Sequence, residues 1–155
     1  MDKIIKNTTA KKDQDHFKMI IEHNPKIPDR TDYLINDGED PTIALYATAK
    51  KLEKREADFI VIPCNTAHAF VDKIQKHLSI PIISMLEEVV NHIKKNYKKT
   101  KKVGLLATSG TINSGIYHKS FEKSGVRLIS PDEENQKYVM DAIYGQKGIK
   151  AGYLV

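Results

Sequence analysis

The stretch Asp58-Phe-Ile-Val-Ile-Pro-Cys-Asn-Thr66 places a short apolar run directly before three polar or reactive residues. The run is rich in Ile and Val, as strands that are covered on both faces of a sheet tend to be. Asn65 and Thr66 are good helix-capping residues and poor residues for the core of a strand. We therefore expect a buried parallel strand that ends at Pro63 and a helix that begins directly after it, with Cys64 at the junction.

Similar apolar runs alternate with helical patterns along the rest of the chain. Further strands are expected at residues 17–23, 80–84, 103–107 and 126–130. Helices are expected at residues 2–7, 41–55, 66–78, 85–97 and 111–124, with a last helix that opens at residue 131. Strands that alternate with helices form βαβ units and parallel sheets. The predicted fold class is therefore α/β, with parallel sheets flanked by helices.

The chain is expected to form two α/β lobes, residues 1–97 and residues 98–155. The lysine-rich run 94–102 lies between two helix–strand pairs and provides the boundary. In each lobe a strand leads into small polar residues, which are Cys64 to Thr66 in the first and Thr108 to Thr111 in the second. Ligands of open α/β sheets usually bind at this carboxyl edge of the strands, so both groups are candidates for a binding site.

Composition excludes several classes of protein. Of 155 residues, 40% are hydrophobic and 29% are charged, which allows a folded core. No apolar run approaches the ~20 residues that a membrane helix needs. A single cysteine cannot form an intramolecular disulfide, so nothing marks the chain as secreted and we expect a cytoplasmic protein.

The net charge of +5 comes largely from the run 94–102. No zinc-ligand spacing or other nucleic-acid recognition motif accompanies this run. Lysines also favour the C-terminal end of a helix, so a solvated helix end explains the run better than a nucleic-acid-binding surface does. We therefore expect neither a nucleic acid nor a membrane as a partner.

Cys64 is the strongest candidate for a reactive group. The N–H groups and the dipole at a helix N-terminus stabilise a thiolate, which could act as a nucleophile or as a base toward a carbon acid. A buried structural cysteine is the alternative. His68 lies four residues later on the same helix face and could pair with the thiol, although a partly exposed helix histidine is slightly favoured. A metal site that adds His16 or His23 lacks a recognisable ligand spacing.

Other segments carry candidate ligand-binding residues. Arg30 follows a loop with two prolines, and its guanidinium could bind a carboxylate or form a surface ion pair. The turn from Thr108 to Thr111 precedes a helix, where backbone N–H groups could bind an anion or a side chain could simply cap the helix. Lys150 lies between glycines, and its own surroundings favour a solvated lysine.

Together these segments resemble the aspartate racemases, which belong to the cofactor-independent aspartate/glutamate racemase superfamily. The similarity covers essentially the whole chain. The segments that carry it are Asn24-Pro-Lys-Ile-Pro-Asp-Arg-Thr31, Gly38-Glu-Asp-Pro41, Pro63-Cys-Asn-Thr-Ala-His68, Ile80-Pro-Ile-Ile-Ser-Met85 and Gly104-Leu-Leu-Ala-Thr108. The cysteine segment is shared by several activities of the superfamily, and the arginine loop makes the match more specific.

The resemblance implies two lobes that face each other across a cleft, and racemisation without pyridoxal phosphate, by one cysteine that removes the Cα proton and another that returns a proton. Cys64 matches the first of these cysteines. The implied substrate is an acidic amino acid, aspartate above all, the implied assembly is a homodimer, and no cofactor or metal ion is expected. The implied substrate-binding residues are Asn65, Thr66, Thr108 and Thr111 for the amino-acid end, Arg30 for the side-chain carboxylate, and Lys150 near the site.

The chain also departs from the family pattern. An opening strand with a glycine-rich turn is missing, and so is the later Gly-Cys-Thr motif that supplies the second cysteine. We therefore expect a truncated or split family member that is poorly stable alone and cannot complete racemisation with two bases. The alternatives are decarboxylase-type chemistry with one cysteine, an amino-acid-binding remnant without catalysis and, least favoured, a nucleic-acid-binding module.

Overall fold

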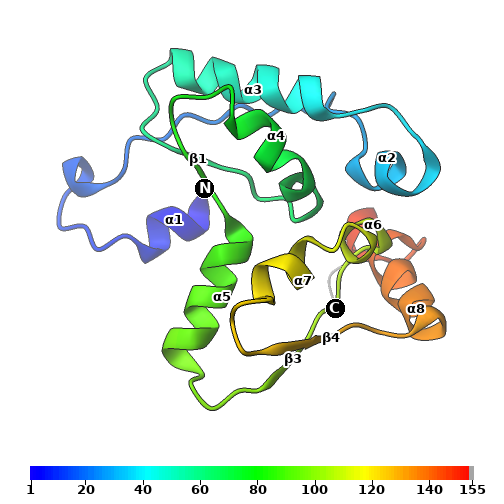
Figure 1. Ribbon diagram of the computed structural model, residues 1–155. Helices are drawn as coiled ribbons and strands as arrows, with labels where there is room; N and C mark the ends of the chain where they lie inside the picture. The colour runs from blue at the N-terminus through cyan, green and yellow to red at the C-terminus, as the bar shows by residue number, and fades with distance from the viewer. Residues whose placement is uncertain (154–155) are drawn as a thin grey trace.

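The structure, a computed structural model, describes residues 1–153 and combines short parallel strands with helices packed against them (Figure 1). The α-helices are α1 (Asp2–Asn7), α2 (Arg30–Asn36), α3 (Thr42–Lys54), α4 (Val71–Gln75), α5 (Met85–Asn96), α6 (Ser109–Asn113), α7 (Ile116–Phe121) and α8 (Glu133–Tyr144). The strands are β1 (Ile60–Val61), β2 (Ile82–Ile83), β3 (Lys102–Gly104) and β4 (Arg127–Ile129), and the 3-10 helices are η1 (Asp13–Asp15), η2 (Thr66–Phe70) and η3 (Ile149–Ala151).

The strands form two separate parallel pairs. In the first pair β1 lies beside β2, with Ile60 opposite Ile82. In the second pair β3 lies beside β4, with Val103 opposite Leu128. Each pair is connected through helices, as parallel strands require. The predicted fold class, α/β with parallel strands flanked by helices, is confirmed.

The first core lies between the β1–β2 pair and the helices α3 and α4, which run close together at the top of Figure 1. Its buried members are Leu45, Ala49, Ile60, Ala67, Phe70, Ile74 and Ile82. Asp40 accepts a hydrogen bond from the backbone N–H of Thr42, at 2.8 Å, and so caps the first turn of α3. This cap and the apolar positions of α3 direct the helix onto the sheet.

The other face of the β1–β2 pair is uncovered. Val61 and Ile83 are neighbours in register, and their side chains are 53% and 37% exposed. Phe59, directly before β1, is 52% exposed. Parallel strands usually have both faces covered, so this face is an apolar surface of the described part of the chain.

The second core lies between α5, α7 and the β3–β4 pair. Leu86 and Val90 of α5 are buried against Tyr117 and Phe121 of α7. The apolar face of α5 therefore packs in the cluster that contains the later strands, although α5 precedes residue 97. The division of the chain into lobes at that residue stays a prediction.

The structure differs from the prediction at residues 17–23, 111–124 and 30–36. Residues 17–23 form no strand: no ladder pairs with them among the described residues, and Phe17 and Ile21 are 65% and 60% exposed. The helix predicted at 111–124 is divided into α6 and α7, because Gly115 takes a left-handed conformation with φ of 66° and begins the second helix. The helix α2 was not predicted, since its seven residues are too few for a clear apolar period.

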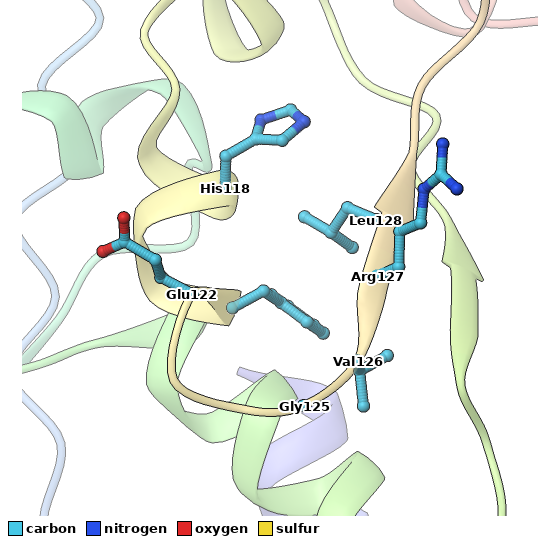
Figure 2. A pocket seen from close by; sticks show the side chains of 7 residues that line it. His118, Glu122, Gly125, Val126, Arg127 and Leu128 are labelled. Atoms are coloured by element: carbon cyan, nitrogen blue, oxygen red, sulfur yellow. The ribbon is translucent and has the colours of Figure 1, made fainter.

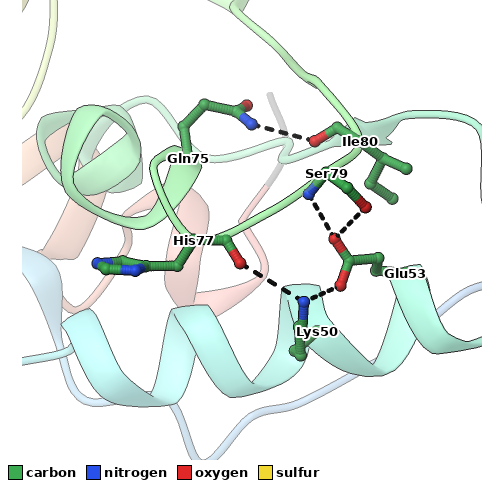
Figure 3. A network of polar contacts seen from close by, with 6 residues as sticks. All are labelled: Lys50, Glu53, Gln75, His77, Ser79 and Ile80. Atoms are coloured by element: carbon green, nitrogen blue, oxygen red, sulfur yellow. Dashed lines mark hydrogen bonds and ion pairs between the residues drawn. The ribbon is translucent and has the colours of Figure 1, made fainter.

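A polar network fixes the segment between α4 and β2 against α3 (Figure 3). The Glu53 carboxylate accepts hydrogen bonds from the backbone N–H and the hydroxyl of Ser79, at 2.6 and 2.8 Å, and pairs with Lys50. Gln75 donates to the carbonyl oxygen of Ile80 at 3.1 Å and accepts from the N–H of Ile82 at 2.7 Å. These bonds hold the start of β2 in register beside β1, and so fix the strand that precedes Cys64.

This network makes a prediction about acid stability. The hydrogen bond from Lys50, followed by those from Ser79, lowers the pKa of Glu53 from its ordinary 4.5 to about 2. A carboxyl group whose pKa is lower in the folded than in the unfolded chain stabilises the fold at pH values above its unfolded-state pKa. This contribution is lost as the pH falls toward the pKa in the folded chain. We expect Glu53→Gln to lower the melting temperature at neutral pH, and the difference from the parent chain to shrink between about pH 5 and pH 2.

Thermal unfolding followed by circular dichroism across this pH range measures the effect. Glu122→Gln, at the exposed end of α7, is the matched control. Its melting temperature should equal that of the parent chain at every pH. A constant difference between the Glu53→Gln variant and the parent from pH 7 to pH 2 would contradict the prediction.

Candidate active site

Cys64 lies just beyond the carboxyl end of β1, as the sequence predicted, and is a free, half-buried thiol. Its backbone N–H donates to the carbonyl oxygen of Ile62 at 2.8 Å, so the chain turns sharply between the strand and η2. The first turn after Cys64 is a 3-10 helix that leads without a break into α4. The thiol is thus positioned by a strand on one side and by a helical run on the other.

His68 bonds to the main chain of Cys64 and not to its thiol. Its Nδ1 lies 2.9 Å from the carbonyl oxygen of Cys64, and its Nε2 accepts from the backbone N–H of Met85 at 3.1 Å. Because a backbone N–H can only donate, Nε2 is the acceptor and Nδ1 carries the proton. The ring is buried, so the prediction of a partly exposed helix histidine is wrong, and it connects the Cys64 turn to the start of α5. Both ring nitrogens are occupied, so a Cys–His pair is not formed in this arrangement.

Three threonine hydroxyls meet next to this turn. The hydroxyl oxygens of Thr66 and Thr111 lie 2.8 Å apart, those of Thr108 and Thr111 3.1 Å apart, and those of Thr66 and Thr108 3.4 Å apart. Thr66 and Thr111 are buried. Thr108 also caps α6, because its hydroxyl accepts from the N–H of Thr111 at 3.3 Å. The structure therefore brings together residues 42 to 45 positions apart in the chain, which the sequence analysis had assigned to one site.

Asn65 has a partner that sequence reasoning missed. The hydroxyl of Tyr117, on α7, donates to Oδ1 of Asn65 at 2.6 Å. Tyr117 is buried, and burial raises the pKa of its hydroxyl above the ordinary value. Asn65 occupies the N-cap position of η2, yet its side chain makes no capping hydrogen bond. A tyrosine six residues after Thr111 carries no signal in the sequence that would link it to Asn65.

Arg30 is the first residue of α2, beside the site. One guanidinium nitrogen, Nη1, donates to the carbonyl oxygens of Pro28 and Ile27 at 2.9 and 3.3 Å. The loop before it is therefore held by its own arginine. Asp29 caps α2 by accepting from the N–H groups of Thr31 and Asp32, at 2.7 and 2.9 Å. The remaining N–H groups of the guanidinium have no partner among residues 1–153 and can bind an anion.

The N-termini of α2 and α6 approach each other closely at Gly110. A Cβ atom at this position would lie 3.0 Å from the Cα atom of Thr31. A glycine is therefore needed to bring the Arg30 end of α2 against the helix that begins at Thr108. This contact is the structural reason that the arginine loop and the threonine turn are neighbours.

Lys150 is exposed and lies in η3, with its ammonium nitrogen 5.0 Å from the centre of the Tyr144 ring. Burial raises the pKa of Asp29, but the hydrogen bonds from Asp32 and Thr31 and the charges of Arg30 and Lys150 outweigh this effect and lower it. Lys150 is thus near enough to interact with the Asp29 carboxylate, next to Arg30. No hydrogen bond joins Lys150 to the threonines among the described residues.

A hollow of about 300 Å³ lies between α7 and β4, away from these residues (Figure 2). Phe121, Val126 and Leu128 form its apolar wall, while the charged ends of Glu122 and Arg127 point away from it. Neither Cys64 nor any of the predicted substrate-binding residues lines it. The imidazole of His118 also lines the hollow and extends into the space between α7 and β4.

Within residues 1–153, no three His, Cys, Asp or Glu side chains gather in a way that could hold a metal ion. The same residues include no helix with the length and apolar content needed to cross a membrane. The candidate site therefore consists of a thiol, hydroxyls, an amide and two cationic side chains.

The chain is similar to known racemases over most of its length. A family model described as Asp/Glu/Hydantoin racemase matches residues 1–152. The chain is 38% identical over 100 residues to the broad specificity amino-acid racemase RacX of Bacillus subtilis (strain 168), covering 64% of this chain and 43% of that protein. It is 32% identical over 80 residues to the glutamate racemase of Aquifex pyrophilus, covering 51% of this chain and 31% of that enzyme.

Among solved structures, the Picrophilus torridus aspartate racemase matches with a TM-score of 0.77 and 26% sequence identity. That match covers 97% of this chain and 68% of the other. The chain spans less than half the length of the two curated relatives.

The close approach at Gly110 makes a prediction about stability. We expect Gly110→Ala to lower the free energy of unfolding by about 1 kcal/mol, because overpacking against Thr31 outweighs the helix propensity that alanine adds. Urea unfolding followed by circular dichroism measures this difference. Gly104→Ala is the matched control, since a Cβ atom there meets nothing within 4 Å. Equal stability of both variants would show that the contact between α2 and α6 is not tight.

Proposed function

The chain belongs to the Asp/Glu/hydantoin racemase family, and we propose that it acts as an amino-acid racemase without pyridoxal phosphate, with Cys64 as an acid/base. The observation that supports this most is the cluster of Thr66, Thr108 and Thr111 hydroxyls beside the Cys64 turn. Hydroxyls and helix N-terminal N–H groups stabilise the negative charge that develops when a Cα–H bond breaks.

In the proposed reaction the Cys64 thiolate removes the Cα proton of the bound amino acid. The electron pair of the broken C–H bond moves toward the α-carboxylate, and the thiolate becomes a thiol. A second acid then gives a proton to Cα from the opposite face, which inverts the configuration. The described chain has one cysteine, so the second acid is either another kind of group or is supplied from outside this sequence.

We propose an acidic amino acid, aspartate, as the substrate. Arg30 begins α2, which packs against α6 at Gly110, and its free N–H groups suit a carboxylate. The charge of Lys150 acts on Asp29, the residue before Arg30, and adds a second positive charge on this side of the site. Curated relatives are named as broad-specificity and glutamate racemases, so size and charge of the substrate are the properties to test. A homodimer in a reducing cytoplasm, which would keep Cys64 as a thiol, completes the proposal.

Hydrogen exchange at Cα tests the role of Cys64. We expect the purified chain to exchange the Cα–H of L-aspartate in D2O without pyridoxal phosphate. Cys64→Ala should reduce the rate at least about a hundredfold, as loss of an acid/base group does. Loss of the Cα–H signal is followed by NMR, and D-aspartate by chiral chromatography. Exchange that is equal in both proteins would contradict the proposal.

The single cysteine favours a second candidate, a half-site with one base. In that case Cys64-dependent exchange would occur with retention of the L configuration, because the same thiol removes and returns the proton on one face. Formation of D-aspartate in the same tube would exclude this candidate. A folded sample that binds aspartate without any exchange would instead be a binding protein.

A second measurement tests the substrate. We expect Arg30→Ala to raise the KM for aspartate at least about tenfold, since hydrogen bonds to charged groups contribute about 1.5–3 kcal/mol. Arg30→Lys should recover part of the loss, and exchange of alanine, which has no side-chain carboxylate, should change little. Arg55→Ala, just beyond α3, is the matched control. An equal effect of Arg30→Ala on both substrates would argue against recognition of the side-chain carboxylate.

A further inference from the structure

We propose that Tyr117 is a positioning residue that fixes the orientation of the Asn65 amide, so that its NH₂ group is presented to the substrate and binds a carboxylate beside Cys64. This inference rests on the proposed function for its substrate. It concerns how the site distinguishes an anion from a cation next to the thiol. Its basis is the hydrogen bond from the Tyr117 hydroxyl to Oδ1 of Asn65.

The length of this bond decides which end of the amide faces Tyr117. The separation of 2.6 Å is typical of O–H···O bonds, whereas N–H···O bonds are about 0.2 Å longer. Burial also raises the pKa of Tyr117, which keeps the hydroxyl protonated and able to donate. The oxygen of the amide therefore faces Tyr117, and the NH₂ group points away from it.

The remaining groups of the side chain have no competing partner. Asn65 is exposed, and its Nδ2 makes no hydrogen bond within the part of the chain that the structure describes. An asparagine at an N-cap commonly uses its oxygen to cap the helix, but this one makes no capping bond. Tyr117 holds the oxygen end of the amide, and the two N–H donors of Nδ2, which have no partner in residues 1–153, are available to a ligand.

The bond also crosses between the two cores. Tyr117 is buried with Phe121 and Leu86 in the second core, while Asn65 adjoins Thr66, the start of η2, at the edge of the first. A buried phenol in one core thus holds an exposed amide at the edge of the other. Without the hydroxyl, the amide can rotate and present its oxygen, which would repel a carboxylate.

The test uses two alkylating reagents that differ in charge. Iodoacetate carries a carboxylate and iodoacetamide does not, and both react at Cys64, the only cysteine. The ratio of their rate constants, measured by mass spectrometry, reports carboxylate binding near the thiol whether or not the chain turns over an amino acid. General loosening of the turn or a change in thiol reactivity alters both rates and leaves the ratio unchanged.

We expect Tyr117→Phe and Asn65→Ala each to lower the iodoacetate-to-iodoacetamide ratio about tenfold, the effect of losing a hydrogen bond to a charged group. The double variant should match Asn65→Ala, because Tyr117 acts through Asn65. Tyr97→Phe, an exposed tyrosine at the end of α5, is the matched control and should keep the parent ratio.

Asn65→Asp provides an independent test if Tyr117→Phe unfolds. Its carboxylate can still accept from Tyr117 but offers no donor, so the ratio should fall further than in Asn65→Ala. An unchanged iodoacetate-to-iodoacetamide ratio in Tyr117→Phe would overturn the proposal. So would a double variant in which the two single variants' effects on the ratio add, because Tyr117 would then not act through Asn65. If the alkylation ratios change as expected but the chain exchanges no Cα–H, the role of Tyr117 and Asn65 in carboxylate binding stands. That result would count only against racemisation.

Discussion

The hydrogen bond between the hydroxyls of Thr66 and Thr111 joins the two apolar cores at the point where the candidate site lies. Each core is a separate cluster, and hydrogen bonds from Thr66 to Thr111 and from Tyr117 to Asn65 run between segments at their edges. A buried hydrogen bond contributes only about 1 kcal/mol to stability, but leaving one of its partners unpaired costs about 1–3 kcal/mol. The two hydroxyls therefore fix how η2 meets α6 more than they add to overall stability.

Short helices concentrate polar groups around this bond. Thr66 begins η2, Thr108 caps α6 and Asp29 caps α2, so three chain segments turn from extended to helical near one another. Gly110 permits the closest of these approaches. Each helix start leaves backbone N–H groups that helical bonding does not use. A carboxylate bound at this place would find hydrogen-bond donors on several sides.

Much of the fold followed from the sequence because apolar runs and caps are local. The apolar runs at β1 and β2 act within a few positions, and the structure agrees with them. The strand expected at 17–23 was wrong because a strand needs a partner, which no local pattern supplies. The same limit applies to the site. Cys64 and the threonines were recognisable by their positions after strands, whereas the bond from Tyr117 to Asn65 depends on how two cores are placed.

The two hydrogen bonds between the His68 ring and the main chain limit which residues can occupy position 68. Its ring places a donor and an acceptor on opposite sides of a rigid plane, and each meets a main-chain group, at Cys64 and at Met85. Glutamine and asparagine also carry a donor and an acceptor, but both are at one end of the side chain. No other amino acid can satisfy both main-chain groups at once. Position 68 should therefore accept fewer substitutions during evolution than most buried positions of the chain.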